Sequence, residues 1–288
     1  MNSKGNPSSG WIGALIWLVC LPALAADRGD TLADRAGVEI NQPAQLTVLW
    51  VASPGWAEPG PDGQPKGAVI DIMNRFAGWL DHTQRIPVEL VFEQETNWGR
   101  FYGRVRDGQG GLFGLGNVTI TPARADELAF SPPYVNNVAV LISHRGFPEL
   151  HHAEELPRVF AGQRAMAFAD TLHEQRLDSL AELAWPEMPV DRTGSNEDIL
   201  AAAAAGSHFG YIDGYHFFRA VDEGLPLKRH SAFDDPGEQF GIIMPLENDW
   251  QALLTEFFSA DGGLKASDWY REALAEHLGP DVARMLLR

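Results

Sequence analysis

Short apolar runs and segments with helical periodicity follow one another along most of this chain. The runs are rich in β-branched and aromatic residues and predict buried strands, at residues 46–51, 88–92, 112–120, 138–142, 165–169, 208–212 and 240–244. After the first run, apolar residues recur at helical spacing, at Val69, Ile72, Met73, Phe76 and Leu80. Strands that alternate with helices predict an α/β fold with a largely parallel sheet.

Periodicity and capping residues predict further helices, at residues 98–105, 171–183, 195–205, 250–259 and 267–278. The helix that begins near Ser195 has the clearest start, because Ser195 is a favourable N-cap and Asp198 occupies the capping-box position. Residues 214–239 give no clear pattern and are predicted as a linking segment.

The first 25 residues have the pattern of a secretory signal peptide. Lys4 is their only charged side chain, residues 11–21 form an apolar run, and Ala23-Leu24-Ala25 supplies small residues for cleavage. A membrane anchor is the alternative, but the run is short for a span. We therefore predict cleavage before Ala26, export to the periplasm, and a leader at residues 26–45.

Composition and charge exclude several classes of protein. A chain of 288 residues predicts one large or two modest domains. The net charge of −17 argues against binding to nucleic acid or to an anionic membrane surface, since both favour basic patches. Cys20 is the only cysteine and lies in the predicted signal peptide, so the mature chain is predicted to form no disulfide.

Two motifs that could suggest other chemistry are poor matches. Residues 108–116 are rich in glycine but lack the Lys-Ser/Thr of a phosphate-binding loop, so a nucleotide site is not predicted. His151 and His152 are adjacent, and adjacent side chains on a helix point about 100° apart. We therefore predict no metal site and no cofactor.

The stretch from Gly116 to Arg124 is the most informative in the sequence. It reads as a strand that ends in a short helix, with Thr121 as the N-cap and Pro122 in the first helical position. Arg124 then lies in the first helical turn, where the helix dipole opposes a cation. From these residues alone, Arg124 is either a surface residue on an ordinary strand–helix turn or a ligand for an anion.

The same stretch resembles a family signature. Thr119-Ile-Thr-Pro-Ala-Arg124, followed by Phe130-Ser-Pro-Pro-Tyr134, is similar to the motif of family 3 of the bacterial extracellular solute-binding proteins. The resemblance extends more weakly from about Leu46 to Gly279. It implies a type II periplasmic-binding-protein fold with two lobes, each a mixed, mostly parallel sheet flanked by helices, joined by a two-stranded hinge.

The resemblance also implies a division of the chain. The expected parts are a signal peptide at 1–25, a leader at 26–45, a first lobe at 46–135 plus 236–288, and a second lobe at 136–235. Pattern alone supports the α/β class but not this particular split.

Matched against the family motif, the first lobe is expected to supply most ligand contacts. The resemblance implies that Asn117 offers its backbone carbonyl to a ligand amino group, that Thr119 offers its hydroxyl and N–H, and that Arg124 pairs with a carboxylate. An aromatic residue after the first strand stacks on the ligand in this family; Trp56 is the best candidate and Trp50 the second. Packing of Trp56 on its own turn is the alternative. Trp98 is expected near the cleft.

The second lobe is expected to complete the site. Asp213, at a strand end, matches the family acid that receives the ligand ammonium, and Thr171 matches a residue that donates to the carboxylate. Asp170 departs from the family pattern, as do Ala169 and Leu112. An acid next to a bound carboxylate would repel it unless it points away, so a cationic or unusual solute is left open.

These expectations give one function and two alternatives. The chain is expected to be a monomeric periplasmic receptor that is not an enzyme and delivers a small polar, amino-acid-like solute to the permease of an ABC importer. One alternative is an enzyme of the same fold, such as a cyclohexadienyl dehydratase; lytic transglycosylases also carry this module. The other is an accessory or sensory domain that does not bind standard amino acids.

Overall fold

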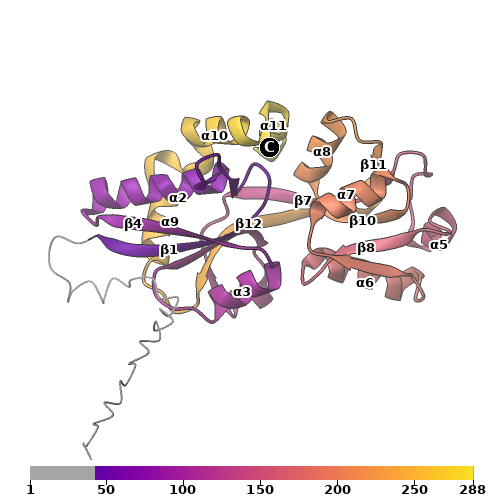
Figure 1. Cartoon of the computed structure of the whole chain (residues 1–288), viewed down its shortest axis with the longest axis horizontal. Coiled ribbons are helices and arrows are strands. Elements are labelled where there is room, and N and C mark those ends of the chain that lie inside the picture. Colours follow the sequence, from indigo (N-terminus) through magenta and orange to yellow (C-terminus); the bar gives the residue numbers. More distant parts are fainter. Residues whose placement is uncertain (1–42, 288) are drawn as a thin grey trace, which may run out of the picture.

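The computed structural model describes residues 43–287. The predicted signal peptide and most of the predicted leader lie outside these residues. Within them, no helix has both the length and the apolar character needed to cross a membrane. The predicted alternation of strands and helices is confirmed, in a mixed sheet flanked by helices (Figure 1).

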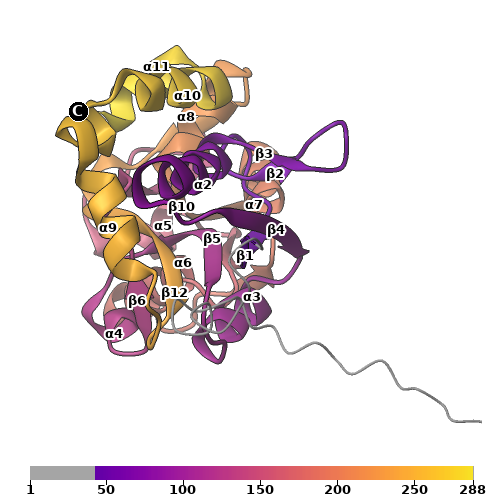
Figure 2. The same ribbon diagram turned by 90° about the vertical axis from the view of Figure 1, so that its left-hand side faces the viewer.

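A parallel group of three strands contains the first strand of the described residues and forms the centre of what we call the first half. These strands are β1 (Ala44–Val51), β4 (Val88–Glu95) and β5 (Leu112–Thr119). The short β6 (Leu128–Phe130) pairs with β12 (Asp235–Pro245), which runs antiparallel to β5. Almost every residue of β1 is buried, because helices cover both faces of the sheet here. Figure 2 shows α2 (Ala68–Trp79) over one face and α3 (Trp98–Arg106) under the other.

The second half contains a smaller parallel group. Its strands are β8 (Arg164–Phe168), β9 (Val190–Thr193) and β10 (His208–Asp213), and β11 (Leu227–Arg229) adds to β7 (Val135–His144). Its helices are α5 (Leu156–Val159), α6 (Leu172–Ala184), α7 (Asn196–Ala204) and α8 (Gly214–Asp222). The sequence pattern predicts a linking segment at residues 214–239, but these residues contain α8 and β11. Because α8 begins directly after β10, no separate loop marks its start.

The two halves are joined by β7 and β12, which pair antiparallel from Phe240 opposite Val135 to Asp235 opposite Ala139. Figure 1 shows both strands passing from one half to the other. The chain thus crosses on two adjacent strands, and this arrangement suits a hinge. The lobe boundaries given above stay a prediction.

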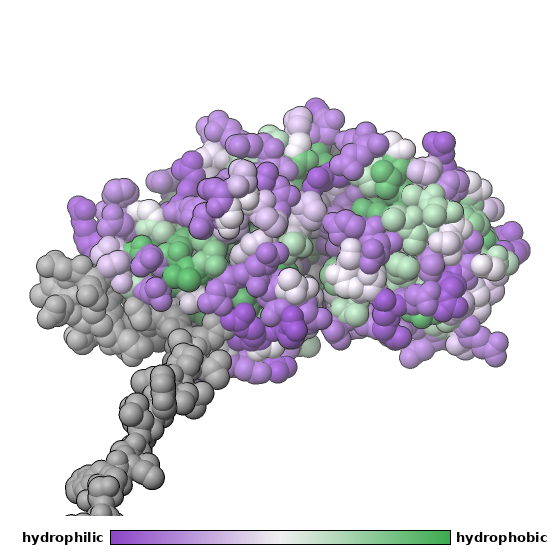
Figure 3. Space-filling view, viewed as in Figure 1, coloured by the Kyte–Doolittle hydropathy of each residue, from purple (hydrophilic) through white to green (hydrophobic). Residues whose placement is uncertain are grey.

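The C-terminal segment returns to the first half. It contains α9 (Gln251–Ser259), α10 (Asp268–Leu278) and α11 (Pro280–Leu286). The first two were predicted within one residue, whereas α11 was missed. The hydrophobic core under these helices includes the buried apolar side chains of α2, which the helical spacing predicted (Val69, Ile72, Met73 and Phe76, with Leu80 just beyond the end of α2). On the face shown in Figure 3, polar side chains cover most of the surface.

Buried histidine makes the stability of the second half sensitive to acid. His230 is fully buried; its Nδ1 accepts a hydrogen bond from the Leu150 N–H (3.1 Å), so its Nε2 carries the proton and donates to Ser143 Oγ (2.8 Å). Burial lowers the pKa of His230 to about 4, below its ordinary value of 6.5. The stabilisation from neutral His230 is therefore complete above pH 6.5 and is lost as the pH falls toward 4.

We expect replacement of His230 by glutamine to flatten the acid side of the stability curve. Between pH 6.5 and 4 the unfolded wild type binds one proton more at this position, which is worth about 1.4 kcal/mol per pH unit. The measurement is the free energy of unfolding by urea at several pH values. His82→Gln, at an exposed position, serves as the control and should keep the wild-type slope. A slope unchanged in His230→Gln would contradict the assignment.

Candidate functional site

A cavity of about 240 Å³ lies between the two halves, at the carboxyl ends of their strands. Ligands of α/β proteins bind at such ends, because loops and helix N-termini converge there. The first half contributes residues at or just after the ends of β1, β4 and β5, and the second half contributes residues at or just after the ends of β8, β9 and β10. The polar side chains that line the cavity include Ser53, Glu95, Asn117, Thr119, Arg124, Thr171, His173, Glu197, Asp213, Tyr215 and Glu238.

Arg124 is placed as the sequence predicted. Thr121 is the N-cap of α4 (Pro122–Ala125), its Oγ1 accepts from the Arg124 N–H (3.2 Å), and Pro122 occupies the first turn. The guanidinium donates from Nη1 to the Thr119 carbonyl (3.1 Å) and lies over the ring of Trp98, 5.3 Å from its centroid. Within residues 43–287, no carboxylate lies within 4.0 Å of the Arg124 side chain. Burial lowers the pKa of Arg124 and outweighs the opposing effects of Tyr102, Glu238 and Glu127, so this charge lies in a poorly solvated position with no carboxylate in direct contact.

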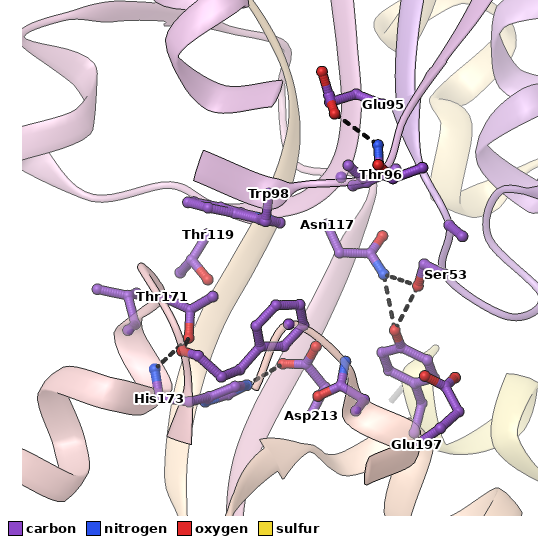
Figure 4. A pocket seen from close by; sticks show the side chains of 18 of the residues that line it. Ser53, Glu95, Thr96, Trp98, Asn117, Thr119, Thr171, His173, Glu197 and Asp213 are labelled. Carbon is purple, nitrogen blue, oxygen red and sulfur yellow. Dashed lines mark hydrogen bonds and ion pairs between the residues drawn. The ribbon is translucent and has the colours of Figure 1, made fainter. Parts of the chain in front are cut away.

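Trp98 is positioned by the turn between β4 and α3. Asn97 caps the helix, its Oδ1 accepting from the Arg100 N–H (2.8 Å). Glu95 Oε1 accepts from the N–H groups of Thr96 (2.8 Å) and Asn97 (3.0 Å) and pairs with Arg100, whose hydrogen bond holds the pKa of Glu95 below its usual value. Figure 4 shows the Trp98 ring at the edge of the cavity. Trp98 therefore lines the site as expected, in contact with Arg124.

Asn117 has an unusual backbone and a fully engaged side chain. Its φ of 50° lies in the left-handed region, which is uncommon for a residue within a strand. Its Oδ1 accepts from Tyr134 Oη (2.8 Å), and its Nδ2 donates to Ser53 Oγ (2.9 Å) and Tyr215 Oη (3.0 Å). Ser53 and Tyr215 are also hydrogen-bonded to each other (2.8 Å). Because Tyr215 belongs to α8 of the second half, this network joins the two halves beside the cavity.

Asp213 lines the cavity but already has partners in the protein. Its Oδ1 accepts from Asn137 Nδ2 (2.7 Å) and lies 3.3 Å from His173 Nε2. Burial alone would raise the pKa of Asp213, but the hydrogen bond and charge of His173 outweigh it and lower the pKa. Asn137 also donates to Glu238 (2.7 Å), and Glu238 is paired with Arg176 of α6. The acid expected to receive an ammonium is thus ionised and fixed in position.

Thr171 and Asp170 follow β8 and have different orientations. Thr171 is the N-cap of α6; its Oγ1 accepts from the His173 N–H (3.2 Å) and donates to the Phe168 carbonyl (2.8 Å). Asp170 has a φ of 63° and does not line the cavity. A Cβ on Gly99 of the first half would lie 3.0 Å from its Oδ2. The Asp170 carboxylate therefore lies near Gly99, in a second hollow that Trp98 and Arg124 also line.

The prediction for Trp56 needs correction. Trp56 is fully buried in the core of the first half and does not line the cavity. Its ring packs against Tyr134 (5.6 Å between centroids) and edge-on against Tyr215 (5.8 Å). The loop folds back through a bridge between Ser53 and Ala57, which turns the indole away from the site. Trp56 therefore supports the tyrosines that hold Asn117.

Comparison with known proteins shows the family of this chain. The profile of the bacterial extracellular solute-binding proteins, family 3, matches residues 52–280. The chain belongs to this family. Solved structures confirm the fold as that of type II periplasmic binding proteins. An ancestral arginine-binding protein bound to arginine has a TM-score of 0.64 and 17% identity, covering 81% of this chain and 96% of its own.

Two further structures have similar scores. A putative L-cystine ABC transporter from Listeria monocytogenes has a TM-score of 0.66 and 11% identity, covering 82% of this chain and 97% of its own. The GluR0 ligand-binding core from Nostoc punctiforme, in complex with L-glutamate, has a TM-score of 0.63 and 14% identity. The match covers 82% of this chain and 100% of the GluR0 core. At these identities the likeness establishes the fold alone.

Curated relatives match a shorter part of the chain. Membrane-bound lytic murein transglycosylase F of Maricaulis maris (strain MCS10) is 33% identical over 128 residues, which are 44% of this chain and 25% of the relative. The protein of the same name from Shewanella pealeana (strain ATCC 700345 / ANG-SQ1) is 26% identical over 170 residues. These residues are 57% of this chain and 33% of that relative. The matches thus span a quarter to a third of these relatives. Both are named as an enzyme, and this contradicts our prediction that the chain is not one.

Proposed function

We propose that the cavity binds a small zwitterionic, amino-acid-like solute. The observation that carries this proposal is Arg124, a poorly solvated guanidinium that lines the cavity without a carboxylate partner in residues 43–287. A ligand carboxylate would supply the missing charge in a bidentate pair, and Thr119 and Thr171 lie on the same lining. The ammonium of the solute would face Asp213, and Trp98 would cover its apolar part.

The proposal extends to a wider role. The proposed mature protein is a periplasmic monomer that begins at Ala26, closes its two lobes around β7 and β12, and delivers the solute to the permease of an ABC importer. The predicted lobes are residues 46–135 with 236–288, and 136–235. Support comes from the solute-binding family and from the two strands that cross between the halves.

The curated relatives favour a second candidate function. Because both relatives are named lytic murein transglycosylases, the second candidate is an enzyme that cleaves murein. Incubation of the purified chain with murein sacculi, followed by chromatography of the soluble products, tests this candidate. Release of muropeptides above a heat-inactivated control would support it, and products equal to that control would count against it.

A thermal-shift screen with the twenty standard amino acids, ornithine and citrulline tests the first proposal. A solute at about 100 times its Kd adds about 2.7 kcal/mol to the stability of the folded state. For a domain of this size, the melting temperature should rise by roughly 5–10 °C. A panel in which no compound raises it at millimolar concentration would contradict the proposal.

A further inference from the structure

One carboxylate of the cavity differs from the other three. Four acidic side chains line the cavity, and three of them have a basic partner within 4.0 Å, in the pairs Glu95–Arg100, Asp213–His173 and Glu238–Arg176. Glu197 has no such partner among residues 43–287. Arg124 is the basic counterpart, since it too lines the cavity and has no carboxylate within 4.0 Å among the same residues.

Glu197 lies in the first turn of α7, on the wall of the second half. Its Oε2 accepts from Ser195 Oγ (2.9 Å), and the side chain is exposed to the cavity. Figure 4 shows Glu197 beside the cavity across from Ser53, on the side away from Trp98. Because Arg124 lies over Trp98, the unpaired carboxylate and the unpaired guanidinium occupy opposite sides of the site.

A simple zwitterion therefore cannot neutralise all the unpaired charges that line the cavity. A solute whose carboxylate pairs with Arg124 and whose ammonium faces Asp213 leaves Glu197 without a counter-charge. Closure of the cleft over this arrangement would remove water from an unpaired carboxylate, which is unfavourable. A second cation on the solute, distant from its carboxylate, would neutralise Glu197 instead.

We propose that Glu197 is a specificity-determining residue and selects amino-acid-like solutes with a cationic side chain. This inference rests on the proposed function of the cavity and names the class of its solute. Asp170, the acid that departs from the family pattern, does not line this cavity, and its carboxylate lies near Gly99 in the neighbouring hollow.

Matched pairs of probes isolate the charge of the side chain. L-Citrulline has the length and shape of L-arginine but carries a neutral urea group, and L-norleucine replaces the ammonium of L-lysine by a methyl group. In calorimetric titrations, the wild type is expected to bind the cationic member of at least one pair about tenfold more tightly or better. In Glu197→Gln this preference should fall to about threefold or less, with the affinity for the neutral member almost unchanged.

Asp198→Asn is the control, because it removes the same charge from the next residue of the same turn. Asp198 accepts a hydrogen bond from Thr193 Oγ1 (2.6 Å) and does not line the cavity. It should therefore keep the wild-type preference. Three results would overturn the inference. Glu197→Gln could keep the full preference for the cationic probe, both variants could lose that preference equally, or the wild type could bind both members of each pair equally well. Binding of neutral amino acids alone would also overturn it but would leave the proposed function standing, whereas absence of any amino-acid binding would overturn the proposed function.

Discussion

Replacement of Arg124 by alanine is expected to reduce solute affinity by roughly two to three and a half orders of magnitude. In the closed cavity, the guanidinium and the solute carboxylate would form a desolvated pair. Removing one member of such a pair typically costs about 3–5 kcal/mol, because the other charge is left buried and unpaired. Arg124→Lys should recover only part of the affinity, since an ammonium cannot form the bidentate contact.

Calorimetric titration of the wild type and both variants measures this effect, with Arg271→Ala as the control. Arg271 forms an exposed pair with Asp268 outside the cavity. Without solute, Arg124→Ala should melt within a few degrees of the wild type, because the lost hydrogen bond to Thr119 is offset by removal of a poorly solvated charge. Wild-type affinity in Arg124→Ala would contradict the carboxylate contact. A large fall in melting temperature would show a structural role instead.

Replacement of Arg176 by leucine is expected to destabilise the fold by about 3–5 kcal/mol, because it breaks a buried ion pair. Arg176 of α6 pairs with Asp235 and Glu238 of β12, and only 6% of the Glu238 side chain is exposed. The substitution would leave the Glu238 carboxylate buried beside Asn137, with no cation within 4.0 Å among residues 43–287. Urea unfolding measures the free energy change.

Two further variants separate the buried charge from the lost side chain. Arg271→Leu breaks an exposed pair, in which 49% of the arginine side chain is accessible, and should cost less than about 1 kcal/mol. Arg176→Leu combined with Glu238→Gln removes both charges and should recover part of the stability. If Arg176→Leu lowers the free energy of unfolding by no more than Arg271→Leu does, the Arg176–Glu238 pair does not stabilise the fold by the expected amount.

The parts of the site that could be predicted from the sequence are those set by local geometry. The strand, N-cap and proline around Thr121 fix the turn that presents Arg124, and all three are short-range features of the sequence. The apolar periodicity of α2 likewise needs no knowledge of its partners, because one face of the helix must be buried wherever it packs. These elements were predicted within a residue or two.

The parts that could not be predicted depend on residues distant in the sequence. The loop around Trp56 is correctly read as a turn, but the side on which its indole packs is decided by Tyr134 and Tyr215. Similarly, Glu197 resembles any acid in a first helical turn. Only the structure shows that every other acid lining the cavity has a basic partner.

The most direct test of the central claim is a crystal structure of the protein with the solute that gives the largest thermal shift. The account predicts the solute in the cavity between the two halves, with its carboxylate within about 3.2 Å of the Arg124 guanidinium and its amine facing Asp213. A saturating solute bound elsewhere on the molecule, or bound in the cavity with its carboxylate away from Arg124, would contradict the account.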